Sequence, residues 1–397
     1  MASDLKLREG FDCTRGFIMA YIKGVGMTKF DVDQRNSYER VYECVNEAID
    51  MSDTGIEDID AVFVSNSEAE SNGERQKHIG PMISSMLQKR IPIITIPAGC
   101  GGGGTALWTA IHYQKNNKEN NILVIGFEKL VANLSEKATD EMLMGGERVY
   151  EQNEGMIFPA QNALVAQQYM MKYNATSDDL ALVALKNHDN AFNNPKARFF
   201  GKKVTMDMIK KSPMVASPLR LFDCSISVDG AAAAIISRDK GDIEIIGSSL
   251  YADRLPAFES RDMTSWEATK LAAAEAYKQA GITAKDVNFA ELHDAFTSVE
   301  LMAYEDLGFI EKGKGRELIK KGITKINGEL PVNASGGLKA KGHPVSATGV
   351  SQIYELVNQM RKRAEKRQLN NTKIGLAHNV GGAGSTATVH ILKNIGG

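Results

Sequence analysis

The chain has 397 residues, of which 43% are hydrophobic and 24% charged, close to the average for globular proteins. This length exceeds one small domain, so we expect two core-forming units and exclude disordered and fibrous classes. The formal net charge of −2 gives no electrostatic basis for binding nucleic acid or an anionic membrane surface.

The cysteines and the start of the chain indicate the compartment. Cys13, Cys44, Cys100 and Cys224 lie far apart and form no CxxC pair, which argues against a zinc knuckle and a disulfide framework. Residues 1–12 lack the apolar stretch of a signal peptide, and no run approaches the roughly 18 apolar residues of a membrane span. We therefore expect a soluble, cytoplasmic protein.

The first predicted unit, within residues 38–67, is a helix followed by a strand. Apolar residues recur on one face of this helix: Val41, Cys44, Val45, Ala48 and Ile49. Gly55 then stops the helix, and residues 61–64 are apolar enough to form a buried strand.

The second unit carries the strongest local signal. An apolar strand ends at Ala98, and the glycine-rich stretch 99–104 opens a helix over 105–113, followed by a strand over 121–127. Cys100 lies in the glycine turn, where the positive end of the helix lowers a thiol pKa and favours the thiolate. The glycines let a substrate carbonyl reach main-chain N–H groups, which predicts an oxyanion hole. The alternative is a structural cysteine beside a phosphate-binding loop, but the Gly-Lys-Ser/Thr ending of a Walker loop is absent.

Residues 129–222 differ in composition from the segments on either side. They are rich in Met, Asn and Lys and contain helical patterns such as residues 162–173, and a strand over 231–236 follows them. We interpret this segment as an insertion. Insertions of this size in α/β enzymes often cover the active site.

Both units recur in the second half of the chain. A helix that ends at Gly281 precedes a strand over 287–292, and the glycine-rich stretch 336–342 precedes a helix over 349–363 and a strand over 373–378. Two different units in the same order indicate a duplicated α/β domain. The predicted domains are an N-terminal half (1–128 and 223–240), an inserted domain (129–222) and a C-terminal half (241–397).

Three histidines in the second half are candidate partners for the cysteine. His293 follows a strand, His343 is held between a glycine and a proline before a helix, and His378 ends a strand and runs into glycines. Each alone is weak evidence for a site. Together they are stronger, because a duplicated α/β fold brings the C-terminal ends of its strands together.

Taken together, these features resemble the thiolase superfamily over essentially the whole chain. The motifs are KNHDNAFNNPKARF (186–199), FDCSISVDGAAAAII (222–236), HDAF (293–296), GHP (342–344) and HN-x-GG (378–382). They are similar to the branch of sterol-carrier-protein-type thiolases and archaeal acetoacetyl-CoA thiolases. The resemblance implies a five-layered α-β-α-β-α fold, made of two similar halves plus a loop domain that receives CoA.

The resemblance also implies roles for individual residues. Cys100 matches the nucleophile that becomes acylated, and His343 matches the histidine that activates it and lines an oxyanion hole. His293 stands where many thiolases carry an asparagine that holds a water at the same hole. Ser225 falls where a serine contacts the pantetheine arm, and Gly381 is our choice for the second oxyanion-hole N–H. CoA thioesters are then substrates, and no metal or permanently bound cofactor is expected.

One departure from the family pattern concerns the second cysteine, which thiolases commonly use as acid and base at the substrate α-carbon. This chain has His378 (or Asn379) at one of the two places where that cysteine occurs, and Ala295 at the other. Our hypothesis is that a histidine, His378 or His293, performs the proton transfer, because an imidazole pKa near 6.5 suits the task.

The activity implied is that of an acetyl-CoA C-acetyltransferase, which condenses two acetyl-CoA through an acetyl-cysteine. The alternatives are a degradative 3-ketoacyl-CoA thiolase and a non-catalytic thiolase-like scaffold subunit. A ketoacyl synthase shares the Cys-His-His set but lacks the GHP block and the inserted domain. A 3-hydroxy-3-methylglutaryl-CoA synthase would need a glutamate base near the nucleophile, and none is evident.

The resemblance further implies partners. Archaeal relatives of this branch suggest the first step of mevalonate and isoprenoid synthesis, beside a 3-hydroxy-3-methylglutaryl-CoA synthase and a small zinc-ribbon/OB-fold protein. A homodimer or a tetramer is the family expectation for the oligomer.

Overall fold

A computed structural model describes residues 20–70, 74–117, 119–130, 140, 143–256, 259–260 and 262–396. Within them, nine strands form one mixed sheet in the order β3-β2-β4-β7-β1-β8-β11-β10-β9, and β5 and β6 form a separate hairpin. The strands are β1 Ala20–Met27, β2 Ile59–Ser65, β3 Ile93–Ile96, β4 Asn121–Glu128, β5 Met214–Ala216, β6 Leu219–Arg220, β7 Gly230–Ser237, β8 Ile243–Ala252, β9 Phe289–Leu292, β10 Ile374–Gly381 and β11 Thr386–Asn394.

The order and direction of the strands show the duplication that the sequence predicts. In the first half, β1 is antiparallel to β7, β7 is antiparallel to β4, and β4, β2 and β3 run parallel. In the second half, β8, β11, β10 and β9 repeat these directions, and a parallel bridge from Ala290 to Val332 stands in the place of β3. The halves join where β1 pairs with the start of β8.

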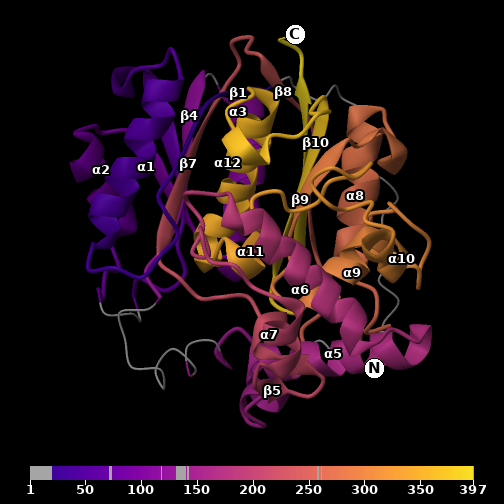
Figure 1. The fold of residues 1–397 in the computed structure, drawn as a ribbon. Helices are drawn as coiled ribbons and strands as arrows, with labels where there is room; N and C mark the ends of the chain where they lie inside the picture. Colours follow the sequence, from indigo (N-terminus) through magenta and orange to yellow (C-terminus); the bar gives the residue numbers. More distant parts are fainter. Residues whose placement is uncertain are drawn as a thin grey trace, which may run out of the picture.

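The helices complete five layers, seen edge-on in Figure 1. Three separate apolar cores lie between these layers. α1 and α2 cover the outer face of the first half-sheet, α3 and α12 fill the space between the half-sheets, and α8 and α9 cover the outer face of the second. These helices are α1 Ser37–Met51, α2 Ile79–Leu87, α3 Gly102–Asn116, α8 Glu267–Ala280, α9 Thr297–Asp306 and α12 Thr348–Met360. The predicted α/β fold of duplicated halves is confirmed.

Local sequence signals explain where several helices begin and end. Asn36 and Glu39 form a capping box at the start of α1, and Gly281 ends α8 in the left-handed conformation at φ 63°. No helix among the residues described here combines the length and the apolar character needed to cross a membrane.

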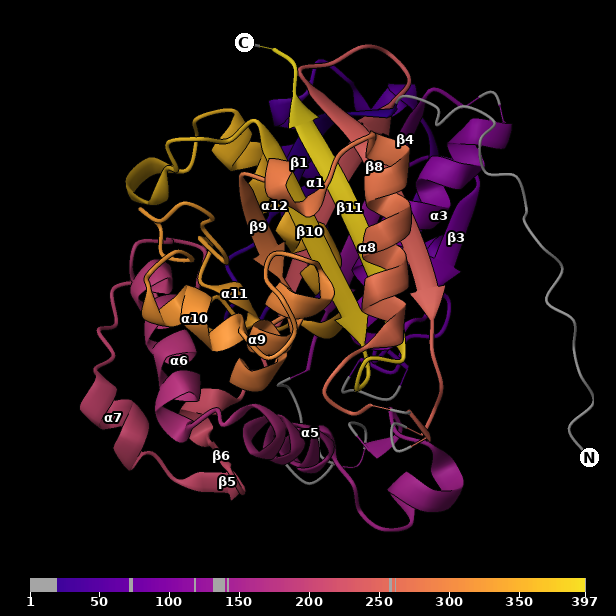
Figure 2. The same cartoon turned by 90° about the vertical axis from the view of Figure 1, so that its right-hand side faces the viewer.

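The inserted segment gathers at one end of the half-sheets (Figure 2). It contains α5 Phe158–Tyr173, α6 Ser177–Phe192, α7 Met206–Lys211 and the hairpin β5–β6, while α10 Gly315–Lys320 and α11 Gly337–Ala340 belong to the second half. Asparagines of the 186–199 motif attach α6 and the residues after it to the second half. Asn190 and Asn194 donate to the carbonyls of Asn333 and Ser335, and Asn187 donates to Asp294. The exact domain boundaries stay a prediction.

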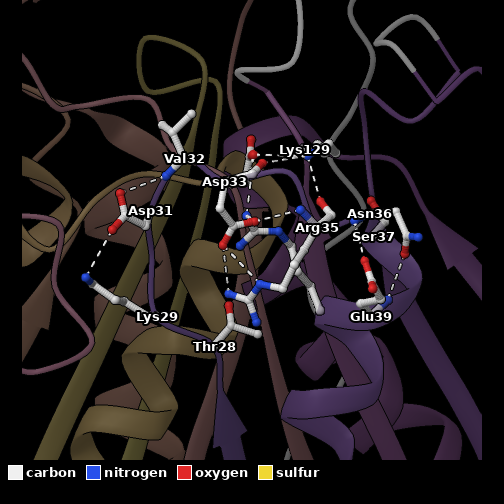
Figure 3. Close-up of polar contacts among 12 residues, drawn as sticks. Thr28, Lys29, Asp31, Val32, Asp33, Arg35, Asn36, Ser37, Glu39 and Lys129 are labelled. Atoms are coloured by element: carbon white, nitrogen blue, oxygen red, sulfur yellow. Dashed lines mark hydrogen bonds and ion pairs between the residues drawn. The ribbon is translucent and has the colours of Figure 1, made fainter.

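A set of charged side chains fixes the segment between β1 and α1 (Figure 3). Lys129, at the end of β4, donates to the carbonyls of Asp33 and Arg35 and lies 3.4 Å from the carboxylate of Asp229, which precedes β7. Arg40 on α1 is almost fully buried and pairs with both Asp33 and Asp229. Charges with this little exposure need partners, so the network fixes how the segment lies on the sheet.

This segment in turn supports the GHP loop, residues 342–344. Phe30 lies between the sheet and that loop. A Cβ added at Gly230 would overlap the Phe30 ring, and a Cβ added at Gly342 would lie 3.3 Å from the Cβ of Phe30. Gly342 has φ +125°, a conformation that side chains other than glycine rarely adopt. Glycine is therefore needed at this position for both space and backbone geometry.

The two central helices touch through glycines. A Cβ at Gly103 would lie 2.9 Å from the backbone nitrogen of Gly349, and a Cβ at Gly349 would overlap the backbone nitrogen of Gly104. Since α3 belongs to the first half and α12 to the second, this contact sets the separation of the halves.

We predict that Gly349→Ala destabilises the protein, although alanine is the better helix former. The new methyl group would meet backbone atoms that cannot move aside, and such overpacking costs about 1–3 kcal/mol. Gly80→Ala on α2 is the matched control, because its nearest contact would be an ordinary 3.7 Å. Thermal unfolding followed by circular dichroism should show a lower midpoint for Gly349→Ala only. Equal midpoints would contradict the close contact.

Candidate active site

Cys100 lies where the two halves meet. It is the central residue of a short 3₁₀ turn, Gly99–Gly101, that leads directly into α3, and the residue as a whole is half-buried. A Cβ at Gly101 would lie 3.1 Å from the backbone nitrogen of Gly381 at the end of β10. The glycine turn of the first half therefore rests against the last strand pair of the second.

His343 is in direct contact with the cysteine. Its Nε2 lies 3.3 Å from the Sγ of Cys100, and its Nδ1 lies 2.7 Å from the hydroxyl of Thr348, the first residue of α12. The backbone N–H of His343 donates to the carbonyl of Ile226, which fixes the loop to the strand-like segment before β7. Both ring nitrogens thus have a defined partner, one of them the candidate nucleophile.

His293 and Asn379 complete the cluster. The ring of His293, which follows β9, is perpendicular to that of His343 with centroids 5.4 Å apart. Asn379 donates from Nδ2 to the carbonyl of Cys100 at 2.9 Å and lies 3.3 Å from Nδ1 of His293. Its Oδ1 accepts from the backbone N–H of Gly104 at 3.1 Å.

The structure does not bring His378 into this cluster. The sequence places it at a strand end, but β10 continues to Gly381, so His378 and Asn379 point to opposite faces of the sheet. The His378 ring is fully buried, and its Nε2 lies 3.0 Å from the hydroxyl of Thr269 on α8, in the outer layer. Of the two alternatives that the sequence leaves open at this motif, Asn379 is the one beside Cys100.

The predicted substrate-binding residues lie around the same place. Ser225 donates its backbone N–H to the carbonyl of Ala295 at 2.8 Å, so it lies beside the HDAF loop. Two backbone N–H groups interact with the Cys100 sulfur and lower its pKa, that of Cys100 itself and that of Gly382, one residue beyond Gly381. Among the residues that the structure describes, no group of three or more His, Cys, Asp and Glu side chains could hold a metal ion.

The electrostatics of Cys100 differ from the sequence expectation. Burial raises the pKa of its thiol to about 12, with further increases from the carboxylates of Glu128 and Glu68, and the backbone N–H groups only partly offset this. The expected lowering by the helix terminus is therefore outweighed. Burial also lowers the pKa of His343 to about 4. At neutral pH the pair is a neutral thiol beside a neutral imidazole, so a proton must move when the sulfur attacks.

Glu128 is a residue that sequence reasoning missed. Burial raises its pKa to about 8, and its oxygens accept hydrogen bonds from the side chain of Asn66 and the backbone N–H groups of Glu68 and Ser346. These contacts hold the turn after the GHP motif against the first half. A carboxylate that directly follows the apolar run ILVIGF was the available signal.

Comparison with known proteins identifies the family of the chain. A family model described as the thiolase N-terminal domain matches residues 24–240, and one described as thiolase C-terminal domain-like matches residues 252–394. The chain belongs to the thiolase family. Similar thiolase relatives include proteins named acetyl-CoA acetyltransferase from Methanothermobacter thermautotrophicus (38% identical, 93% of this chain and 97% of the relative) and Methanocaldococcus jannaschii (35% identical, 94% and 98%).

Solved structures support the thiolase fold. The Ltp2-ChsH2(DUF35) aldolase superposes with a TM-score of 0.81 at 22% identity, covering 94% of this chain and 97% of that chain. The acetyl-CoA acetyltransferase from Syntrophomonas wolfei superposes with a TM-score of 0.70 at 17% identity, covering 96% of this chain and all of that one. At these identities the likeness extends to the fold alone.

We predict that alkylation of Cys100 by iodoacetamide accelerates continuously from pH 7 to pH 10. The reactive thiolate is a minority below the raised pKa, and its fraction grows about tenfold per pH unit. Peptide mass spectrometry would follow the rate at Cys100, with the fully buried Cys44 as an internal control that stays unlabelled in the native protein. A rate that is already constant at pH 7 would instead indicate a preformed thiolate–imidazolium pair.

Proposed function

We propose that this acyltransferase of the thiolase family is an acetyl-CoA C-acetyltransferase, which condenses two acetyl-CoA to acetoacetyl-CoA. The observation that carries the proposal is the 3.3 Å contact between the Cys100 sulfur and Nε2 of His343. The two archaeal relatives named acetyl-CoA acetyltransferase, similar over nearly their whole length, support the choice of acyl group.

In the first step Cys100 attacks the thioester carbonyl of acetyl-CoA. His343 accepts the thiol proton at Nε2 as the sulfur–carbon bond forms, and it returns the proton to the departing CoA thiolate. The negative charge that develops on the carbonyl oxygen needs donors nearby. The N–H of Gly382 and the ring of His293 are the groups we assign to this task, with Gly381 beside them.

In the second step an α-proton leaves the methyl group of another acetyl-CoA, and the resulting enolate attacks acetyl-Cys100. Two of the candidate histidines remain for this proton transfer, because the His378 ring lies on the far face of β10. These are His293, one of the two bases predicted from the sequence, and His343, whose Nε2 contacts the sulfur.

CoA thioesters are the substrates in this proposal, and no permanently bound cofactor takes part. The inserted domain would receive the CoA, with Ser225 beside the pantetheine arm. This placement of the pantetheine arm is supported by the position of Ser225 next to the HDAF loop. The neighbouring residue, Ile226, accepts a hydrogen bond at its carbonyl from the backbone N–H of His343.

Two other functions make different predictions. A degradative 3-ketoacyl-CoA thiolase would use the same groups but prefer cleavage of longer chains. A scaffold subunit would need no chemistry, and the absence of a cysteine at Ala295 and Asn379 favours it. The contact between Cys100 and His343 favours catalysis. The hydrogen bond between Nδ1 and Thr348 orients the ring toward the sulfur, and the backbone hydrogen bond to Ile226 holds the loop in place.

We further propose a place in mevalonate and isoprenoid synthesis. Condensation of two acetyl-CoA is uphill, so a 3-hydroxy-3-methylglutaryl-CoA synthase that consumes acetoacetyl-CoA would be a useful partner, together with a zinc-ribbon/OB-fold protein. A cytoplasmic homodimer or tetramer completes the proposal. β3 forms one edge of the described sheet and exposes Ile94, which suits association between copies.

We predict that the protein gains the mass of one acetyl group when it is mixed with acetyl-CoA, and that Cys100→Ser abolishes this gain. Cys224→Ser is the matched control and should acetylate normally. Intact-mass spectrometry gives the result directly. An acetylated Cys100→Ser protein would refute the nucleophile, whereas a wild-type protein that never acetylates and releases no CoA would favour the scaffold.

Comparing acetoacetyl-CoA with longer 3-ketoacyl-CoA substrates in thiolysis separates the remaining two functions. We expect the highest kcat/KM for acetoacetyl-CoA. A preference for long chains would identify the degradative enzyme.

A further inference from the structure

We propose that Asn379 fixes the proton of His293 on Nε2, so that His293 acts as a hydrogen-bond donor and His343 alone transfers protons in both steps. This inference rests on the proposed condensation. It begins from the hydrogen bonds of one amide, which decide a question that the proposed function leaves open, namely which imidazole removes the α-proton.

The orientation of the Asn379 amide is determined by its two backbone partners. The N–H of Gly104 can only donate, so the atom 3.1 Å away must be the amide oxygen. The carbonyl of Cys100 can only accept, so the atom 2.9 Å away must be the amide nitrogen. Turning the amide over would place its nitrogen against the Gly104 N–H, donor against donor, and its oxygen against the Cys100 carbonyl, acceptor against acceptor.

The same amide nitrogen has a second hydrogen, and His293 Nδ1 lies 3.3 Å away. Because Nδ2 of an asparagine cannot accept, Nδ1 of His293 must present its lone pair. A neutral imidazole with a lone pair on Nδ1 carries its proton on Nε2. His293 is almost fully buried, and burial together with the His343 and His378 rings lowers its pKa far below 6.5, which keeps it neutral.

The opposite tautomer is fixed at His343. The thiol of Cys100 must donate to Nε2 before it attacks, so Nδ1 carries the proton and donates to the Thr348 hydroxyl at 2.7 Å. The two perpendicular rings therefore have complementary roles. His293 offers an N–H, and His343 offers a lone pair.

The proton balance closes with one base. After acetylation His343 has passed the thiol proton to CoA and is neutral again. Its Nε2 then takes a proton from the methyl group of the second acetyl-CoA, and the C–H electron pair becomes the enolate, whose oxygen accepts from His293 Nε2–H. The enolate carbon attacks acetyl-Cys100, the carbon–sulfur bond breaks, and the thiolate takes the proton back from His343.

His293→Gln is the first test, because glutamine can donate a hydrogen bond but cannot remove an α-proton. We expect acetylation and condensation to fall by a similar factor, on the order of tenfold to a hundredfold. The two are measured as CoA release from a single acetylation and as acetoacetyl-CoA formed by the acetylated enzyme. If condensation falls a thousandfold further than acetylation, His293 is the base and the proposal is overturned.

The second test observes the tautomer itself, independently of activity. In protein labelled with ¹⁵N only at histidine, the two His293 ring nitrogens should show a protonated Nε2 and an unprotonated Nδ1 at pH 7. His293→Gln identifies the signals by their loss. Asn379→Asp, which can accept but not donate, should move the proton to Nδ1 and lower both half-reactions, while circular dichroism checks folding.

Thr269→Val is the matched control, because it changes the partner of His378 on the other face of β10 and should leave the His293 signals in place. A protonated Nδ1 in the wild type, or unchanged His293 signals in Asn379→Asp, would overturn the role of Asn379. These spectra require no turnover. A protein that shows the expected tautomer but forms no acetoacetyl-CoA would refute the proposed function and leave the role of Asn379 standing.

Discussion

The hydrogen bond between Cys100 and His343 joins residues that are 243 positions apart. Contacts between the two halves hold these residues together. Cys100 stands before α3 of the first half and His343 stands before α12 of the second. Glycine contacts bring these two helices to backbone distance, and the Glu128 and Phe30 contacts press the GHP loop onto the first half. Neither half contains both groups, so a single half could not form the pair.

Burial gives this pair its chemical character. Burial raises the pKa of the Cys100 thiol and lowers the pKa of the His343 imidazole, which favours the neutral form of both groups. Under the proposed function the nucleophile is generated as the sulfur attacks, and the developing charge moves onto an oxyanion held by N–H groups. A resting thiolate would be more exposed to oxidation and alkylation. The arrangement therefore favours attack on a bound thioester over attack on other electrophiles.

The sequence predicted the fold well because its signals repeat. The helix stops at Gly55 and Gly281 and the glycine-rich helix starts occur twice in the same order, and duplication turned weak local patterns into an architecture. Strands β1, β8 and β11 were not identified, although Gly241 before β8 and Gly382 and Gly384 before β11 were available turn signals. Their pairing across the sheet defines them. At the site, Cys100, His293 and His343 converge as the motifs suggested. His378 lies on the other face of β10, against Thr269, because successive residues of a strand alternate between faces and sequence patterns do not fix the register that closely. The predicted lowering of the thiol pKa was wrong, because local helix geometry is visible in a sequence whereas burial by distant segments is not.

The same geometry gives a physical reason for an asparagine rather than a cysteine at position 379. A cysteine at position 379 could serve as an acid, but it could not simultaneously accept from Gly104, donate to the Cys100 carbonyl and bind His293, as the asparagine does. With His293 in the HDAF motif, the proposed hydrogen-bond donor is an imidazole that must be kept in one tautomer. An amide beside it is the side chain that can enforce that tautomer without adding charge. The asparagine and the histidine are therefore physically coupled, because the Asn379 amide sets the tautomer on which the proposed role of His293 depends.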